Sequence, residues 1–122
     1  MKNNFLVILT FFYCTLTWTQ VKFEAEVSKN KLGVNENLRI DFKMNKDGDN
    51  FSPPNFDGFN IVGGPNQSVS NSWINGTRTF SKTYSYFLSP VKRGRFTIGQ
   101  ASIEIEGDIY KTSPVDIQVV EA

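Results

Sequence analysis

The chain has 122 residues, with 13 basic and 12 acidic side chains, no histidine and a single cysteine, Cys14. This near-neutral balance argues against nucleic acid as a partner and against a polybasic membrane anchor. Without histidine, and with one cysteine, the chain cannot build Ser-His-Asp or Cys-His nucleophilic sites or the usual zinc ligand sets. We therefore expect no enzymatic activity, no catalytic residues, no metal site and no cofactor.

Residues 1–20 have the pattern of a secretory signal peptide, with Lys2 in a positive first region and an apolar run at Phe5–Phe12. This run is too short to span a bilayer by itself, and the rest of the sequence contains no second apolar stretch. A buried first strand is the alternative interpretation. A bulky residue precedes Cys14, which disfavours a lipoprotein signal. We expect cleavage near Val21 and export to the periplasm or the periplasmic face of the inner membrane.

Residues 21–122 are predicted to form one domain built from β-strands. Apolar and charged residues alternate along Phe23–Val27 and Leu38–Met44, a period that places one set in a core and the other in water. The consecutive prolines Pro53-Pro54 open an irregular stretch. A short strand near Phe59–Val62 is expected to end at the Gly-Gly-Pro that follows it.

Asn75-Gly76 is the strongest local signal in the chain, because this pair favours the type I′ turn of a two-residue hairpin. The turn sets Trp73 opposite Arg78 and starts a long strand that continues to about Ser89. Lys82 interrupts the apolar face of that strand, so we expect its stem to pack and its ammonium to reach solvent.

The last third of the chain continues the same pattern. Gly107-Asp108 predicts a second tight hairpin that pairs Glu104 with Lys111. Seven to nine short strands in total favour an antiparallel, immunoglobulin-like β-sandwich, with a small closed barrel as the alternative. The predicted core residues are Leu38, Ile40, Phe42, Tyr84, Tyr86, Ile103, Ile105, Ile117 and Val119.

Three residues are candidates for partner binding. Trp73 and Arg78 face each other at a hairpin end, and both are residue types that dominate binding hot spots. Trp73 has two interpretations: a cap over the sandwich with Arg78 stacked on it, or an exposed anchor for a partner or a sugar. Arg93, in the Lys92-Arg93-Gly94 turn, is the second choice.

From Phe59 to Val119 the sequence resembles the N-terminal domain of BatD-type proteins, the bacterial oxygen-tolerance family. The resemblance rests on GGP-x-x-S-x-S, the NG hairpin, T-Y-S-Y-x-L-x-P-x-K-x-G-x-F-T-I and Y-x-T-x-P-V. It implies an exported protein with immunoglobulin-like domains, encoded together with MoxR-type ATPases and von Willebrand A-type proteins. Members usually continue into later domains and a membrane helix, whereas this sequence ends at Ala122, which predicts a fragment, a truncated gene or a short relative.

The sequence and the resemblance together predict a non-catalytic protein-interaction module of a bacterial cell-envelope complex. The expected partners are envelope proteins, in particular von Willebrand A-type proteins of the same complex. The alternative function is a carbohydrate- or surface-binding sandwich that uses exposed aromatic side chains, for which Trp73, Phe56 and Phe59 are the candidates.

Overall fold

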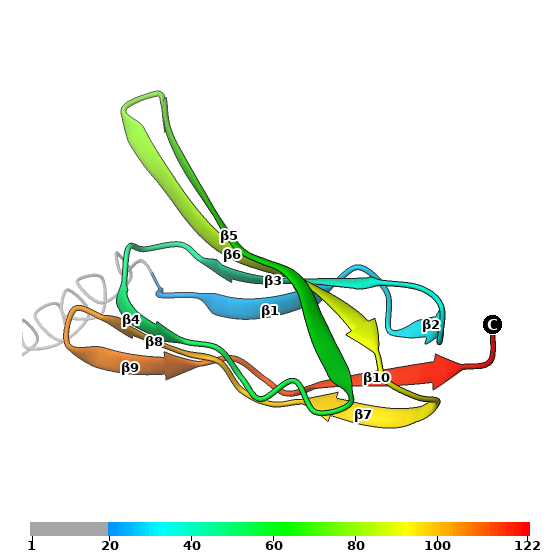
Figure 1. Ribbon diagram of the computed structural model, residues 1–122. Helices are drawn as coiled ribbons and strands as arrows, with labels where there is room; N and C mark the ends of the chain where they lie inside the picture. Colours follow the sequence, from blue (N-terminus) through cyan, green and yellow to red (C-terminus); the bar gives the residue numbers. More distant parts are fainter. Residues whose placement is uncertain (1–19) are drawn as a thin grey trace, which may run out of the picture.

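The computed structural model describes residues 20–122, so the predicted signal segment lies outside the described residues except for Gln20. The described residues form strands, turns and bends, arranged as an elongated sandwich from which one hairpin projects (Figure 1). The all-β prediction is confirmed. The strands are β1 (Phe23–Val27), β2 (Lys31–Gly33), β3 (Leu38–Met44), β4 (Asp49–Ser52), β5 (Phe59–Ile74), β6 (Thr77–Pro90), β7 (Gly94–Ile98), β8 (Ser102–Ile105), β9 (Asp108–Lys111) and β10 (Val115–Val120).

The first layer is a four-stranded antiparallel sheet in the order β1-β3-β6-β5. The central strand β3 pairs with β6 so that Ile40 lies opposite Tyr86 and Phe42 opposite Tyr84. When the strands are named in chain order, this sheet has the A-B-E-D arrangement of an immunoglobulin constant domain.

The second layer consists of two three-stranded sheets, β2-β10-β7 and β4-β8-β9. They are successive parts of one long hairpin, because β7 continues into β8 and β9 continues into β10 (Figure 1). At the junction the N–H of Thr112 donates to the carbonyl of Ala101 at 3.0 Å, and the N–H of Ala101 donates to Thr112 Oγ1 at 2.9 Å. The β4-β8-β9 order corresponds to C-F-G, which confirms the immunoglobulin-like sandwich. Strand β2 pairs with β10 in parallel, the one departure from the antiparallel expectation among the described strands.

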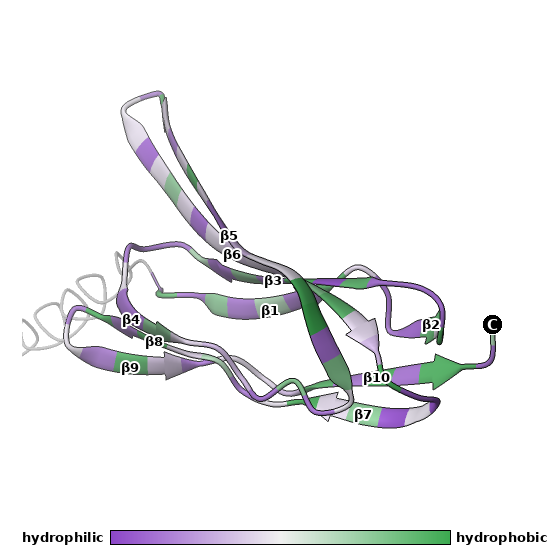
Figure 2. Ribbon diagram, viewed as in Figure 1, coloured by the Kyte–Doolittle hydropathy of each residue, from purple (hydrophilic) through white to green (hydrophobic). Residues whose placement is uncertain are grey.

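The core lies between the two layers and follows the predicted alternation, which is visible along the strands in Figure 2. Eight of the nine predicted core residues are buried, and Tyr84 is half-buried against the same cluster. The alternation fixes the face of each residue, because successive side chains in a strand point to opposite sides of the sheet. The buried predicted residues are Leu38, Ile40, Phe42, Tyr86, Ile103, Ile105, Ile117 and Val119.

The second hairpin turns one residue earlier than predicted. Its central residues are Glu106 and Gly107, with φ angles of 53° and 85°, and Ile105 lies opposite Asp108. A type I′ turn needs positive φ at both central positions, and glycine occupies the second of them here as it does in Asn75-Gly76. Glu104 therefore pairs with Ile109, and the predicted pairing with Lys111 is wrong.

Strand β5 is also much longer than predicted. It passes through Gly63-Gly64-Pro65 and continues to Ile74, with register shifts between Ile61 and Gly63 and between Gly63 and Asn66. Proline is tolerated here because β5 is the last strand of its sheet, so the missing N–H would have pointed away from β6. The bulges absorb the irregular segment and let the hairpin extend beyond the sandwich.

Candidate partner-binding surface

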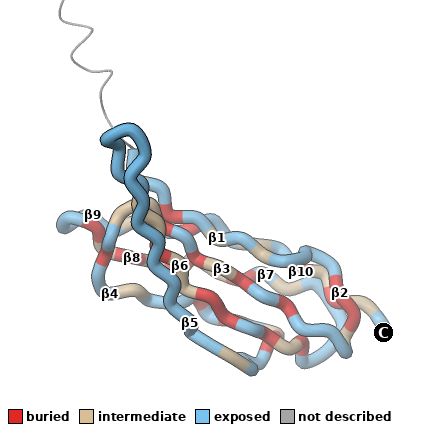
Figure 3. Tube along the Cα trace, turned by 90° about the horizontal axis from the view of Figure 1, so that it is seen from above, coloured by how far each residue is buried: buried red, intermediate tan, exposed pale blue. Residues whose placement is uncertain are grey.

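The tip of the β5–β6 hairpin is an arm that extends away from both layers of the sandwich (Figure 1). Toward the turn, the pairing between β6 and β3 ends at Lys82, which lies opposite Met44. The segment Ser70–Ser81 beyond it is therefore a ribbon of two strands only. We call this segment the arm. Five residues per strand at about 3.3 Å each give it a length of roughly 16 Å. Seen from above, the arm is almost entirely exposed, whereas buried positions gather in the body (Figure 3).

The Asn75-Gly76 turn that closes the arm is as predicted. Asn75 and Gly76 have φ angles of 52° and 79°, and the register places Ile74 opposite Thr77 and Trp73 opposite Arg78. A Cβ at Gly76 would meet no atom within 4 Å, so nothing else packs against the turn.

Trp73 does not cap the sandwich. Its side chain is 71% exposed, and the arm holds it away from the core. Arg78 interacts with other residues: its Nε donates to Asn71 Oδ1 at 2.8 Å, and its guanidinium carbon lies 5.5 Å from the centre of the Phe80 ring. These contacts direct the guanidinium toward Asn71 and Phe80, and the indole of Trp73 stays exposed, as the exposed-anchor interpretation requires.

Other exposed or half-buried apolar side chains lie on the arm and just below it. Val69 and Trp73 share one face of β5, and Ile74 lies on the other; all three are more than half exposed. Phe80, on β6, lies opposite Asn71 and is half-buried. An exposed apolar group of this kind, bordered by the arginine at position 78, is typical of an interaction surface.

Arg93 lies at the opposite end of the molecule, in the turn between β6 and β7 (Figure 1). The 14 residues of β6 run from the tip of the arm to this turn, a length of about 45 Å along the strand. Arg93 Nη1 lies 3.1 Å from Glu121 Oε1, and both side chains are exposed. The structure therefore brings Trp73 and Arg78 together and places Arg93 elsewhere.

Phe56 and Phe59 are core residues in this fold. Both are buried; the Phe56 ring lies 5.2 Å from that of Tyr86, and the Phe59 ring lies 5.7 Å from that of Phe96. They cannot form a flat aromatic platform with Trp73. The predicted carbohydrate surface loses two of its three candidate residues for this reason.

Lys82 lies at the base of the arm. Its ammonium was expected to reach open solvent, but it does not. Its side chain is only 11% exposed, and Nζ donates to Asp47 Oδ1 at 3.1 Å. Burial acts to lower the pKa of Lys82, but the hydrogen bonds and negative charges of Asp47 and Tyr84 outweigh it and raise the pKa above its ordinary value. The lysine therefore remains charged and anchors the arm to the loop that contains Asp47.

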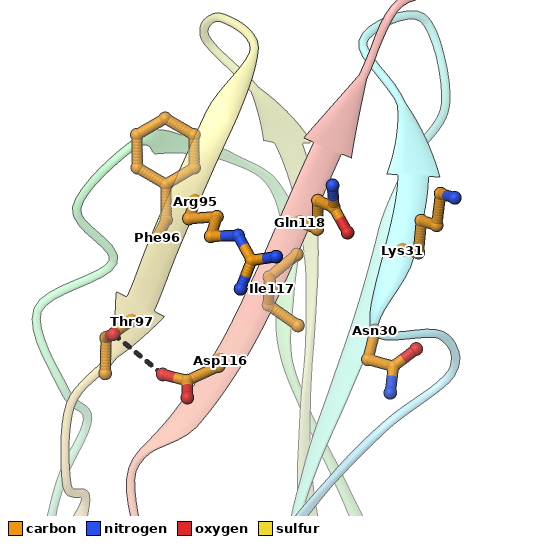
Figure 4. A pocket seen from close by; sticks show the side chains of 8 residues that line it. All are labelled: Asn30, Lys31, Arg95, Phe96, Thr97, Asp116, Ile117 and Gln118. Carbon is orange, nitrogen blue, oxygen red and sulfur yellow. Dashed lines mark hydrogen bonds between the residues drawn. The ribbon is translucent and has the colours of Figure 1, made fainter.

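A shallow polar groove of about 420 Å³ crosses the outer face of the β2-β10-β7 sheet (Figure 4). Arg95 and Thr97 on β7 face Asp116 and Gln118 on β10, and Thr97 Oγ1 donates to Asp116 Oδ1 at 2.8 Å. No motif or spacing in the sequence indicates this groove, because the outward positions of any solvated strand carry similar polar residues.

Residues 20–122 contain no cluster of three or more acidic, histidine or cysteine residues that could hold a metal ion. The same part of the chain includes no helix that is long and apolar enough to cross a membrane.

The strand order and the packed core define this chain as an immunoglobulin-like β-sandwich domain with an exposed, aromatic-tipped arm. Residues 25–119 match the BatD DUF11 like domain, which covers most of the chain and all of both layers except the ends of two strands. The chain therefore belongs to the BatD family, as the resemblance predicted. A search of curated proteins found no match.

Proposed function

We propose that this domain is a non-catalytic protein-interaction module of a bacterial cell-envelope complex associated with oxygen tolerance. One observation carries the proposal: in a chain of the BatD family, the sandwich extends an arm whose tip exposes Trp73 beside a fixed arginine, Arg78. Tryptophan and arginine are among the residue types that most often dominate the energy of a protein interface.

The proposed partners are envelope proteins, in particular von Willebrand A-type proteins of the same complex. The near-neutral charge of the chain supports a protein partner over nucleic acid or an anionic membrane surface. The residue inventory supports a non-catalytic role, because the chain has no histidine and its one cysteine, Cys14, falls in the proposed signal peptide.

The proposal places the protein outside the cytoplasm. The Lys2 region and the apolar run Phe5–Phe12 support export through a cleaved signal peptide. N-terminal sequencing of the protein recovered from the envelope fraction should give a start near Val21. An intact Met1 on a protein found in the cytoplasm would contradict this part of the proposal.

Titration calorimetry with a purified von Willebrand A-type protein of the proposed complex tests the interaction. Trp73→Ala should weaken binding by about 2 kcal/mol or more, because it removes the anchor of the contact. Ile109→Ala is the matched control, since Ile109 is 67% exposed and belongs to β9, in the second layer of the sandwich. Ile109→Ala should leave the affinity unchanged.

The folding stability of both variants completes the test. Trp73 is too exposed to support the core, so Trp73→Ala should change the free energy of unfolding by no more than about 0.5 kcal/mol. Equal affinity of the wild-type protein and Trp73→Ala would overturn the role of the arm. Failure of the full chain to bind any envelope protein of that complex would overturn the proposed function.

A further inference from the structure

The outer edge of β5 differs from the other sheet edges in the described part of the chain. The edge strands there are β1, β2, β4, β5, β7 and β9. Five of them carry at least one charged residue, such as Glu24 and Glu26 in β1 or Asp108 and Lys111 in β9. The 16 residues of β5 include no charged residue at all. Charges on edge strands are a common protection against pairing with another chain, and β5 has none.

The two halves of β5 differ in their β-bulges, which are a second form of protection against pairing with another chain. Register shifts interrupt the segment between Ile61 and Asn66, and such bulges turn an edge away from pairing. From Asn66 to Ile74 the register against β6 is unbroken and every residue is exposed. This upper half is thus a long, regular and uncharged edge.

The turn fixes which backbone groups this edge presents. In a two-residue hairpin the residues that flank the turn, Ile74 and Thr77, form a hydrogen-bonded pair. Alternate residues of β5 from Ile74 back to Asn66 therefore direct their N–H and C=O groups to β6. The residues between them, at positions 67, 69, 71 and 73, direct about eight backbone groups away from the hairpin.

We propose that a second copy of this chain pairs with that edge, β5 against β5 in antiparallel orientation, about a twofold axis at Ser70. This register places Gln67 opposite Trp73 of the second copy and Val69 opposite Asn71 of the second copy. Each outward group then finds a partner, which gives about eight hydrogen bonds across the interface. The proposal goes beyond the proposed function, since it concerns the edge of the arm and assigns it a different partner.

Charge and side-chain chemistry favour a second copy as the occupant. A twofold axis pairs β5 with the β5 strand of the second copy, so a charged residue near the axis would lie close to the same charge in that copy. β5 has no charged residue, so this repulsion does not arise. The basic residues Arg78 and Lys82 lie one strand further in. They are separated from those of the second copy by three strand spacings, about 14 Å, which exceeds the screening length in physiological salt.

The same register also places exposed apolar side chains of the two copies next to each other along the edge. Trp73 becomes a diagonal neighbour of Val69 in the second copy, and both side chains are more than half exposed in the single chain. The arm alone is a two-stranded ribbon, which is marginally stable in water, whereas the pairing makes it part of a four-stranded ribbon. The bodies of the two copies lie at opposite ends of this ribbon.

Sedimentation of the full chain, purified from cells, over a wide concentration range tests the proposal. The wild-type chain should sediment as a monomer–dimer equilibrium. Ser70→Lys places two ammonium groups opposite each other at the axis and should raise the dimer dissociation constant at least about tenfold. Thr79→Lys is the matched control: Thr79 is exposed on β6 on the same face of the hairpin, so it should leave the constant unchanged.

A cross-link keeps the test decisive if Ser70→Lys fails to fold. In a Cys14→Ser background, Ser70→Cys places two thiols at a non-hydrogen-bonded pair with Cα atoms about 4.5 Å apart, within the range of a disulfide. Mild oxidation should then yield a covalent dimer, and Thr79→Cys in the same background should not.

Three results would overturn the proposal: a wild-type chain that remains monomeric at every concentration, an equal effect of Ser70→Lys and Thr79→Lys, or no cross-link through Ser70→Cys. Ser70 lies on the face of β5 opposite to Trp73, so Ser70→Lys leaves the anchor of the proposed partner in place. A wild-type chain that remains monomeric but still binds the envelope partner would overturn this inference alone.

Discussion

The Lys82 ammonium donates to Asp47 Oδ1 at 3.1 Å, and the two residues differ sharply in their surroundings. The lysine side chain is almost buried, whereas the aspartate side chain is 73% exposed. The ammonium also lies 5.4 Å from the centre of the Tyr84 ring. An aspartate in the loop after β3 thus compensates a positive charge that the apolar face of β6 holds at the base of the arm.

Stability should fall at alkaline pH because of this pair and of Tyr86. The pKa of Lys82 is raised above 10.5: burial opposes its charge, and Asp47 and Tyr84 outweigh that effect. The pKa of Tyr86 is raised above 10.0 by burial and by the charge of Tyr84. Above about pH 10 the unfolded chain loses these protons before the folded chain does, so the free energy of unfolding decreases until the pH passes the raised values.

Urea unfolding between about pH 8 and pH 12 measures this dependence. The midpoint should be constant up to about pH 10 and fall above it. Tyr86→Phe removes one contribution and should make the fall shallower. An unchanged pH profile in Tyr86→Phe and in Lys82→Met would show that other groups cause the alkaline loss.

Removing the charge of Asp47 should cost more than removing the charge of Lys82. Asp47→Asn leaves the Lys82 ammonium nearly buried without its counter-charge, and we expect a loss of about 1 kcal/mol, limited by the exposure of Asp47. Lys82→Met keeps the packed stem and removes the charge, so its loss should be smaller. Glu121→Gln, in an ion pair exposed on both sides, is the control and should change stability little. Chemical denaturation of the three variants decides the order.

Core truncations should confirm which face of each strand carries the stability. Ile40 and Tyr86 lie opposite each other between the two layers and are almost fully buried. Replacing either by alanine should cost about 2–5 kcal/mol in unfolding free energy. Ile109→Ala, at an exposed apolar position, should cost less than about 0.5 kcal/mol. Equal losses at Ile40 and Ile109 would contradict the assignment of the core.

The sequence predicted the core because a period of two assigns each residue to a face without knowledge of the rest of the fold. Ile40 and Ile103 are examples: both alternate with charged or polar residues, and both are buried. The same pattern does not say how far the opposite layer extends. Lys82 was expected to reach solvent, but the loop that contains Asp47 covers it, and no local signal indicates such a contact between residues 35 positions apart.

The candidate surface was only partly predictable for the same reason. Asn75-Gly76 fixed the turn and the pairing of Trp73 with Arg78, because the chemistry of a two-residue turn is local. Whether Trp73 caps the core or projects from it depends on where β3 ends relative to β6, a long-range relationship. The second hairpin was also only partly predictable from local sequence. Its turn lies one residue earlier than predicted, at Glu106-Gly107, so Glu104 pairs with Ile109 instead of Lys111.

A buried hydrogen bond joins the two strands of the second layer at the junction between its two halves. Thr112 is buried there, and its Oγ1 accepts a hydrogen bond from the N–H of Ala101 at 2.9 Å. Valine has nearly the shape of threonine, but Thr112→Val leaves the N–H of Ala101 without an acceptor in a buried position, at a cost of about 1–3 kcal/mol. Thr112→Ser keeps the acceptor and loses one methyl group, at a cost of about 0.8 kcal/mol. Urea unfolding should therefore rank the stabilities as threonine, serine, valine, and hydrogen exchange at the Ala101 amide should accelerate in Thr112→Val but much less in Thr112→Ser. If Thr112→Val is as stable as the wild-type chain, packing rather than this hydrogen bond holds the junction.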